Sequence, residues 1–200
     1  MYRSKELRWF SRQETEHIAH WFLRHHLSFD TVESRSDQYL VDYSREDIAP
    51  KLREGNIEIK YRIHPPREYA LSRTVNGYFE EWVKWSFQLD ARHKLAREII
   101  SGQFYAQEWL EVQKERMGVK VIRQDGDLEI HGIEEFFRSG CQIEYTRIQV
   151  AAKTWYSFNL EWFGDEFTEL DDTLLLDILG DSALHLQESM GYGKFLKQIR

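Results

Sequence analysis

Strict alternation of apolar and charged residues marks the segment from Ile57 to Ile63. Apolar or aromatic side chains occupy every second position, and the positions between them hold Glu58, Lys60 and Arg62. Successive side chains of a β-strand point to opposite faces, so this pattern predicts a strand with one buried face and one charged face.

A shorter alternating segment lies just upstream, where Lys51 and Arg53 flank a leucine. Residues 54–56 read Glu-Gly-Asn and supply turn chemistry, so the two segments are expected to form a β-hairpin. A loop with an even number of residues places Lys51 and Arg53 on the charged face of the next strand. A three-residue loop would place them on the isoleucine face, which burial disfavours.

One face of this hairpin is therefore expected to hold four cations and one carboxylate. Like charges on neighbouring strands repel one another, so such a face needs an explanation. It is either solvated, as one face of many antiparallel sheets is, or it lines a cavity that receives a polyanion. The hairpin alone leaves both interpretations open.

Alternation elsewhere predicts about eight strands, which favours a barrel or closed sheet over a parallel α/β fold. Besides the hairpin, the expected strands cover residues 5–10, 33–41, 81–88, 111–117, 119–123 with 128–130, 141–150 and 154–163. Residues 67–79 are expected to form a polar connection.

Helical spacing and capping signals predict helices near both ends of the chain. Ser11 and Glu14 have the spacing of a capping box, so a helix is expected to begin there. Further helices are expected over residues 91–101, 133–137, 168–179 and 182–190, and residues 191–200 form either a docked or a frayed tail. The predicted fold class is α+β: an antiparallel eight-stranded β-barrel with flanking helices, formed by residues 1–200 as a single domain.

Composition narrows the class of protein. The 200 residues are 42% hydrophobic and 30% charged, with a formal net charge of -7 and a single cysteine, Cys141. The lone cysteine fits a reducing compartment, no apolar run reaches the length of a membrane span, and the first residues lack the apolar core of a signal peptide. We therefore expect a cytoplasmic protein without a membrane partner. The acidic balance also disfavours nucleic acid as a partner.

The polar faces of the predicted strands carry many ionisable side chains of both signs. The basic members are Arg8, Lys51, Arg53, Lys60, Arg62, Lys84, Lys114 and Arg116. The acidic members are Glu6, Glu58, Asp127, Glu129, Glu144 and Glu161. In a closed barrel with a charged lumen, arginine and lysine would neutralise phosphate oxygens, and carboxylates would hold a hard divalent metal ion.

Residues 37–63 resemble the early hairpin of the CYTH superfamily, also called triphosphate tunnel metalloenzymes. The likeness rests on Tyr39-Leu40, Leu52-Arg53 and Ile59-Lys60 with Arg62. Segments 82–87 (WVKWSF) and 112–116 (VQKER) are similar to the family's later basic strands, 141–164 to its acidic strands, and 191–196 (GYGKFL) to its closing segment.

This resemblance implies an eight-stranded antiparallel barrel whose charged interior binds triphosphate and a divalent metal, Mg²⁺ or Mn²⁺. It implies that the eight basic residues named above bind phosphate and that Glu6, Glu144 and Glu161 bind the metal. The opening strand departs from the family's Glu-x-Glu-x-Lys pattern, because Arg8 replaces an acid and Phe10 stands in the place of the lysine. Thr146 likewise stands where active members tend to carry an acid. Fewer carboxylates mean weaker metal binding.

Three hypotheses follow from these residues. The chain is a metal-dependent triphosphatase acting on a phosphorylated small molecule, or it is a non-catalytic module that binds such an anion without metal. The third hypothesis is a β-rich interaction domain whose charged faces are solvated. The position of the charged side chains, inside or outside the barrel, separates the first two from the third.

Overall fold

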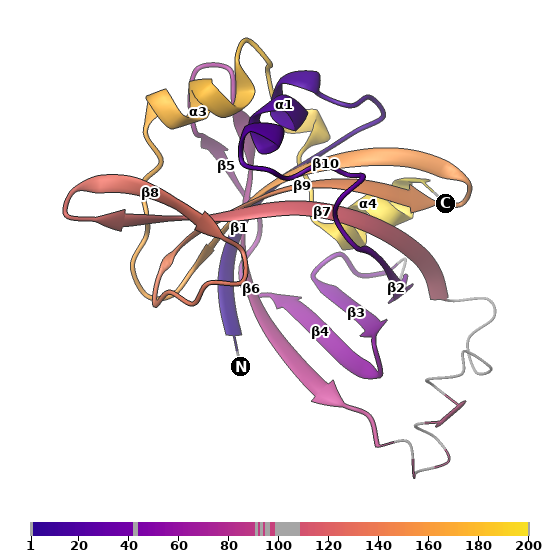
Figure 1. Cartoon of the computed structure of the whole chain (residues 1–200). Helices are drawn as coiled ribbons and strands as arrows, with labels where there is room; N and C mark the ends of the chain where they lie inside the picture. The colour runs from indigo at the N-terminus through magenta and orange to yellow at the C-terminus, as the bar shows by residue number, and fades with distance from the viewer. Residues whose placement is uncertain are drawn as a thin grey trace.

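The computed structural model describes residues 2–41, 44–90, 92, 94, 97–98 and 109–199 (Figure 1). The strands are β1 (Tyr2–Ser11), β2 (Ser34–Leu40), β3 (Ile48–Arg53), β4 (Asn56–Arg62), β5 (Arg67–Ala70), β6 (Asn76–Gln88), β7 (Trp109–Gln124), β8 (Asp127–Gly132), β9 (Gly140–Val150) and β10 (Lys153–Phe163). The helices are α1 (Glu16–Arg24), α3 (Asp172–Leu179), the short 3₁₀ helix η1 (Leu186–Glu188) and α4 (Tyr192–Ile199).

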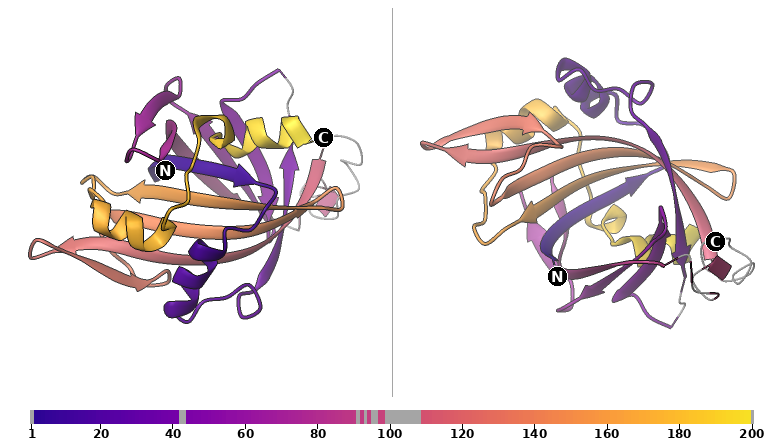
Figure 2. Two further views of the ribbon diagram at one scale, coloured as in Figure 1. Left: turned by 90° about the horizontal axis from the view of Figure 1, so that it is seen from above. Right: turned by 60° about the horizontal axis from the view of Figure 1, so that its bottom comes forward.

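Eight strands close into an antiparallel barrel. Their order is β1-β10-β9-β7-β2-β3-β4-β6, and β6 pairs again with β1 to close the circle. Two short strands lie off this path, β5 on β6 and β8 on β7. Figure 2 shows the curved sheet from two directions, with α1 and α3 on its outer side. The predicted eight-stranded antiparallel barrel with flanking helices is confirmed.

The β3–β4 hairpin has a two-residue turn, the even-numbered loop that burial favours. Arg53 pairs with Asn56, so Lys51 lies directly opposite Glu58. The turn residues Glu54 and Gly55 have φ angles of 47° and 77°. Two consecutive positive φ angles are the signature of a tight hairpin turn whose twist matches that of the strands.

Replacing Gly55 by Ala is expected to lower the free energy of unfolding by about 1–2 kcal/mol. No atom lies within 4 Å of a Cβ added there, so the cost comes from the left-handed backbone alone. Urea unfolding monitored by tryptophan fluorescence would measure it. Gly132→Ala serves as the control, because it changes the same atoms without a positive φ and should have a much smaller effect. Equal effects of the two changes would contradict the explanation.

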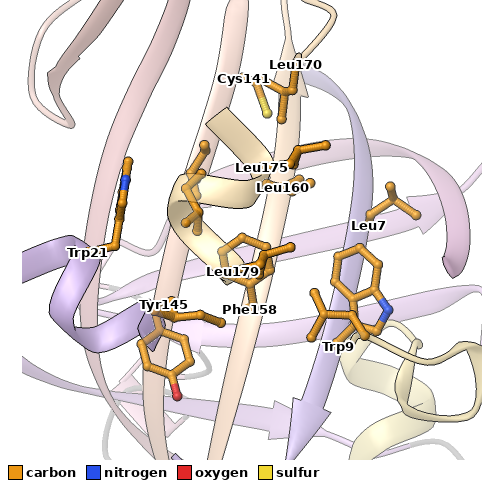
Figure 3. Packing of buried hydrophobic residues seen from close by; sticks show 14 of the residues in the cluster. Leu7, Trp9, Trp21, Cys141, Tyr145, Phe158, Leu160, Leu170, Leu175 and Leu179 are labelled. Carbon is orange, nitrogen blue, oxygen red and sulfur yellow. The ribbon is translucent and has the colours of Figure 1, made fainter. Parts of the chain in front are cut away.

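The main hydrophobic core lies on the outer side of the barrel rather than inside it. Outward-facing side chains of β1, β9 and β10 pack beneath α1 and α3, and Figure 3 shows Leu175 and Leu179 of α3 next to Leu160 and Phe158 of β10, with Trp21 of α1 farther to the left. Burial of this outer face supplies the driving force for folding. The inward faces are therefore free to hold charge.

The C-terminal helix α4 packs on a second, smaller core. On β1, β7 and β9 the inward positions change along the strand from charged to apolar, and these apolar side chains, including Phe10 and Ile148, contact Phe195 and Leu196 of α4. The Phe195 ring stacks on Phe10 with centroids 3.8 Å apart. Residues 191–199 are thus docked, and Phe10 provides part of the contact surface.

Several local predictions from the sequence were wrong. The helix α1 begins at Glu16 with Thr15 as its N-cap, because β1 continues to Ser11. Residues 133–137 form turns, and residues 182–190 contain only the short helix η1, since neither segment has an apolar face to bury along a full helix. Residues 109–124 form one long strand in place of two, and residues 67–79 contain β5 and the start of β6.

The predicted helix over residues 91–101 falls mostly outside the described residues, which include only 92, 94, 97 and 98 of it. In the part of the chain that is described, no helix has both the length and the apolar character needed to cross a membrane.

Candidate functional site

A cavity of about 110 Å³ lies inside the barrel. Its lining residues come from all eight barrel strands and from the start of α4: Glu6, Arg8, Arg35, Tyr39, Ala49, Lys51, Arg53, Glu58, Lys60, Trp82, Lys84, Lys114, Arg116, Glu144, Thr146, Glu161, Gly191 and Tyr192. One buried water needs only about 10–15 Å³ of such volume, so the cavity has room for a small polyatomic ligand.

Ten of the eleven site residues predicted from the sequence line this cavity. The exception is Arg62, which lies beyond it. Its Nη1 donates to Oε1 of Glu80 at 2.6 Å, and both side chains are almost fully buried. Burial raises the pKa of Glu80, while the charge of Arg62 opposes that rise. The Arg62 guanidinium therefore neutralises a buried carboxylate rather than facing the cavity.

The basic side of the cavity is built around Asp37, whose side chain is 0% exposed. Arg53 donates to both carboxylate oxygens, from Nε at 2.7 Å and from Nη2 at 2.9 Å, and Lys114 Nζ donates to Oδ2 at 2.9 Å. Lys51 Nζ and Arg35 Nε each lie 3.6 Å from an Asp37 oxygen. Four cations from β2, β3 and β7 thus converge on one carboxylate.

Two pairs of like charges stand directly opposite each other across neighbouring strands. Lys60 of β4 faces Lys84 of β6, and Arg35 of β2 faces Lys114 of β7. Such pairs destabilise a sheet unless an anion lies between or beside them. Among the described residues that line the cavity, eight are cationic and four are carboxylates, so even with Asp37 included the site has an excess of positive charge. This excess is local, because the whole chain carries a formal charge of -7.

The acidic side of the cavity is formed by β1, β9 and β10. Glu6 lies opposite Glu161, and its carboxylate accepts a hydrogen bond from Lys60 and lies 3.5 Å from Nη2 of Arg8. Lys60 Nζ also lies 3.8 Å from Oε1 of Glu161. Burial alone would raise the pKa of Glu6, but the positive charges of Lys60 and Arg8 bring it below its ordinary value. Burial raises the pKa of Glu161.

Glu144 has hydrogen-bond partners different from those described for Glu6 and Glu161. Its Oε1 accepts hydrogen bonds from Arg116 Nη1 at 2.6 Å and Gln142 Nε2 at 2.5 Å, and Asn159 Nδ2 donates to Oε2 at 3.3 Å. Burial opposes ionisation, yet Arg116 and Arg8 lower the pKa of Glu144 to about 2. The carboxylate is ionised at neutral pH and already has its partners.

This arrangement does not fit a divalent metal ion. Four carboxylates line the cavity, but each has a cation beside it: Lys60 lies beside Glu6 and Glu161, Arg116 binds Glu144, and Lys51 contacts Glu58. In the described part of the chain no three His, Cys, Asp or Glu side chains are grouped as metal ligands. Mg²⁺ needs about six oxygen ligands at about 2.1 Å, so it would have to displace these cations. Binding of Mg²⁺ or Mn²⁺ stays an untested prediction that the geometry does not favour.

Two arginines retain donors for a ligand. Within the described residues, the buried Nε atoms of Arg8 and Arg35 have no hydrogen-bond partner. Arg8 otherwise lies 3.5 Å from Glu6 and over the Tyr192 ring at 4.9 Å, and Arg35 lies 3.6 Å from Asp37. A buried guanidinium without a full set of acceptors is costly, and a bound anion would supply them.

Sequence reasoning missed the contribution of β2. Arg35, Asp37 and Tyr39 alternate along this strand and all reach the cavity region, so the period of two could have identified them. The sequence census was wrong to include Asp127 and Glu129, because β8 pairs only with β7 outside the barrel circle. Tyr192 could not be predicted, since it enters the cavity from α4.

The fold and site together define a class of protein: an antiparallel eight-stranded barrel with a buried, mainly basic internal cavity. No protein-family model matches the chain, and no curated protein matches it in sequence. A search of solved structures finds similarity to a protein from Bacillus halodurans provisionally named an adenylate cyclase. That match covers 100% of both chains at 8% identity, with a TM-score of 0.49. The fold described above rests on the strand pairing of this chain itself.

Proposed function

We propose that the chain is a CYTH-like protein that binds triphosphate, or a small molecule carrying a similar chain of phosphates, in the barrel lumen. The single observation that supports this is the convergence of cationic side chains from six strands on one internal cavity. A solvated sheet face would spread these charges outward. Here they are enclosed, and the cations that line the cavity outnumber the carboxylates that could neutralise them.

The arginines and lysines that line the cavity would bind phosphate in different ways. Arg53 and Arg116 present planar forks that match two phosphate oxygens, although each already shares its fork with a carboxylate. Lys51, Lys84 and Lys114 act as point charges. A ligand with several negative charges would interact with several of these groups at once, so phosphate chains should bind better than a single phosphate.

We propose binding without metal and without hydrolysis as the main activity. Phosphoryl transfer by a protein depends on positioning the phosphates and neutralising charge that develops on the oxygens, usually with a divalent ion. In this lumen Arg8 and Lys60 already neutralise Glu6, so the charges that would hold such an ion are satisfied. A metal-dependent triphosphatase is the second candidate, favoured by the presence of three carboxylates, Glu6, Glu144 and Glu161, in the cavity lining.

Calorimetric titration with inorganic triphosphate in the presence of EDTA tests the proposal. We expect saturable binding that weakens with added salt, and much weaker binding of orthophosphate or sulfate, which have fewer charges to place. Failure of triphosphate to bind would overturn the proposed function. A phosphate-release assay with Mg²⁺ or Mn²⁺ separates the candidates: release above the uncatalysed rate supports the triphosphatase, and none supports the binding module.

A further inference from the structure

Asp37 is an acidic residue in the middle of the basic side of the cavity, where a carboxylate should weaken anion binding. It does not appear in the cavity lining itself and lies behind it, fully buried. Its two oxygens accept three hydrogen bonds, two from Arg53 and one from Lys114. Burial alone would raise its pKa, but these hydrogen bonds and charges hold it far below the ordinary value. Asp37 is therefore a permanent anion at any physiological pH.

The two lysines beside Asp37 are buried deeply enough to lose their protons more easily than usual. Burial lowers the pKa of Lys51 to about 8, although the nearby charge of Asp37 opposes the shift. Burial also lowers the pKa of Lys114 well below its ordinary value, again opposed by Asp37. A neutral lysine binds phosphate only weakly, because its point charge is what attracts the anion.

Other charged groups face this lysine pair from every neighbouring strand. The neighbouring cations disfavour the charged form of the two lysines, whereas the acids and the tyrosine hydroxyl favour it. Lys51 contacts Glu58 of β4 at 2.8 Å, and Lys114 donates to the Tyr39 hydroxyl at 2.6 Å. The remaining groups are Arg35 of β2, Arg53 of β3, Arg116 of β7, Arg8 of β1 and Tyr192 of α4. Since the cations outnumber the acids, Asp37 is the main group that favours the charged form of both lysines at once.

We propose that Asp37 is a positioning residue for polyanion binding: it keeps Lys51 and Lys114 as ammonium ions and fixes the Arg53 fork beside them, so that a ready-made cationic surface faces the ligand. This inference rests on the proposed function and names the part of the lumen that does the binding. The contact distances are consistent with this role. Lys51 and Arg35 stay 3.6 Å from Asp37, too far for full hydrogen bonds, and the close contact of Lys51 with Glu58 occupies only one of its three ammonium donors.

The sign of the pH dependence follows from the lysines. Anion binding requires the ammonium form of both lysines, so affinity falls as the pH rises, and the loss due to Lys51 is centred on its pKa of about 8. Removing the carboxylate removes a group that stabilises the ammonium form. In Asp37→Asn, the loss of affinity should therefore begin at lower pH, by about one pH unit or more.

The experiment is a titration of inorganic triphosphate into the purified full chain at a series of pH values from about 6 to about 9, a range that spans the Lys51 pKa. The chain itself, Asp37→Asn and Glu115→Gln are compared. Glu115→Gln is the matched control, because it removes one negative charge beside Lys114 in sequence but on a side chain paired with Arg147. The ionisation of triphosphate changes with pH in the same way in all three titrations. The ratio of the affinities of two proteins at the same pH therefore reflects only the difference between the proteins.

We expect the Asp37→Asn midpoint to move to lower pH while Glu115→Gln follows the unchanged chain. Coincident midpoints for all three would overturn the inference, and so would an affinity that falls by the same factor at every pH, since that result assigns Asp37 a structural role only. Failure of the unchanged chain to bind triphosphate at any pH would instead overturn the proposed function, so the two failures are distinguishable.

Asp37→Asn leaves buried cations without their acceptor and can fail to fold. Circular dichroism and thermal melting check this. The charge-compensated variant Asp37→Asn/Lys114→Met removes one cation together with the anion. The inference can then still be tested if Asp37→Asn alone does not fold, because Lys51 titrates without Asp37 in this variant. Its midpoint should also move to lower pH, compared with Lys114→Met alone. An unchanged midpoint in this pair overturns the inference.

Discussion

Replacing Lys114 by Met is expected to weaken the binding of inorganic triphosphate by roughly 30- to 1000-fold, equivalent to about 2–4 kcal/mol. The ammonium group is 5% exposed and lies in the middle of the basic side, between Asp37 and the Tyr39 hydroxyl. Methionine fills similar space without the charge. The change removes a cation that faces the ligand and leaves Asp37 with one fewer partner, and both effects disfavour an anion.

Calorimetry at neutral pH would measure this loss, and Lys153→Met is its control. Lys153 is an exposed lysine at the start of β10, so the net charge changes equally while the lumen stays intact. Thermal melting shows whether Lys114→Met remains folded, which we expect because Asp37 keeps Arg53, Lys51 and Arg35 as neighbours. An affinity close to that of the Lys153→Met control would argue that the ligand does not lie in this cavity.

Replacing Phe195 by Ala is expected to lower the free energy of unfolding by about 3–5 kcal/mol. The ring is 1% exposed, stacks on Phe10 and meets the edge of Trp155 at a centroid distance of 5.2 Å. Alanine would leave a cavity between α4 and the apolar end of the lumen. Because α4 also supplies Tyr192 to the cavity lining, the same change should weaken triphosphate binding.

Equilibrium urea unfolding would measure the change in stability from the transition midpoint at constant slope. Gln198→Ala is the matched control on the same helix, since residue 198 is exposed and its truncation should alter stability by no more than about 0.5 kcal/mol. If Phe195→Ala cost no more than this control, α4 would not be held by the contacts described here.

The opening strand explains why the site departs from a metal centre. Arg8 pairs with Glu6 and lies over Tyr192, and Phe10 packs on Phe195, so both unusual residues of this strand connect the lumen to α4. Arg8 places a cation, and not an oxygen ligand for a metal, on the inward face of this strand.

Much of the barrel could be predicted because its strands alternate strictly. On β10 the small and polar side chains Ser157, Asn159 and Glu161 all face inward, as the pattern indicates, and the tight turn of β3–β4 fixed the parity of Lys51. The helices were harder to predict. Residues 133–137 are too few to form a stable helix. Residues 182–190 equal α1 in length but contain only η1, which has no buried residues.

Some features of the site depended on contacts between residues far apart in the chain. Arg62 has the same alternation as Lys60, yet it lies beside Glu80 and beyond the cavity. No local sequence pattern indicates that four cations surround Asp37, because its partners come from β2, β3 and β7. Only closure of the barrel brings them together.

The sequence by itself determined which residues share a face, since the period of a strand is a local property of the backbone. The apolar end of the interior near Phe10 and Ile148 became visible only with α4 packed on it. The tertiary structure decided that the charged faces point inward, because α1 and α3 bury the opposite faces. It also decided which acid neutralises which base, because ion pairing depends on distances across the barrel that no local pattern encodes.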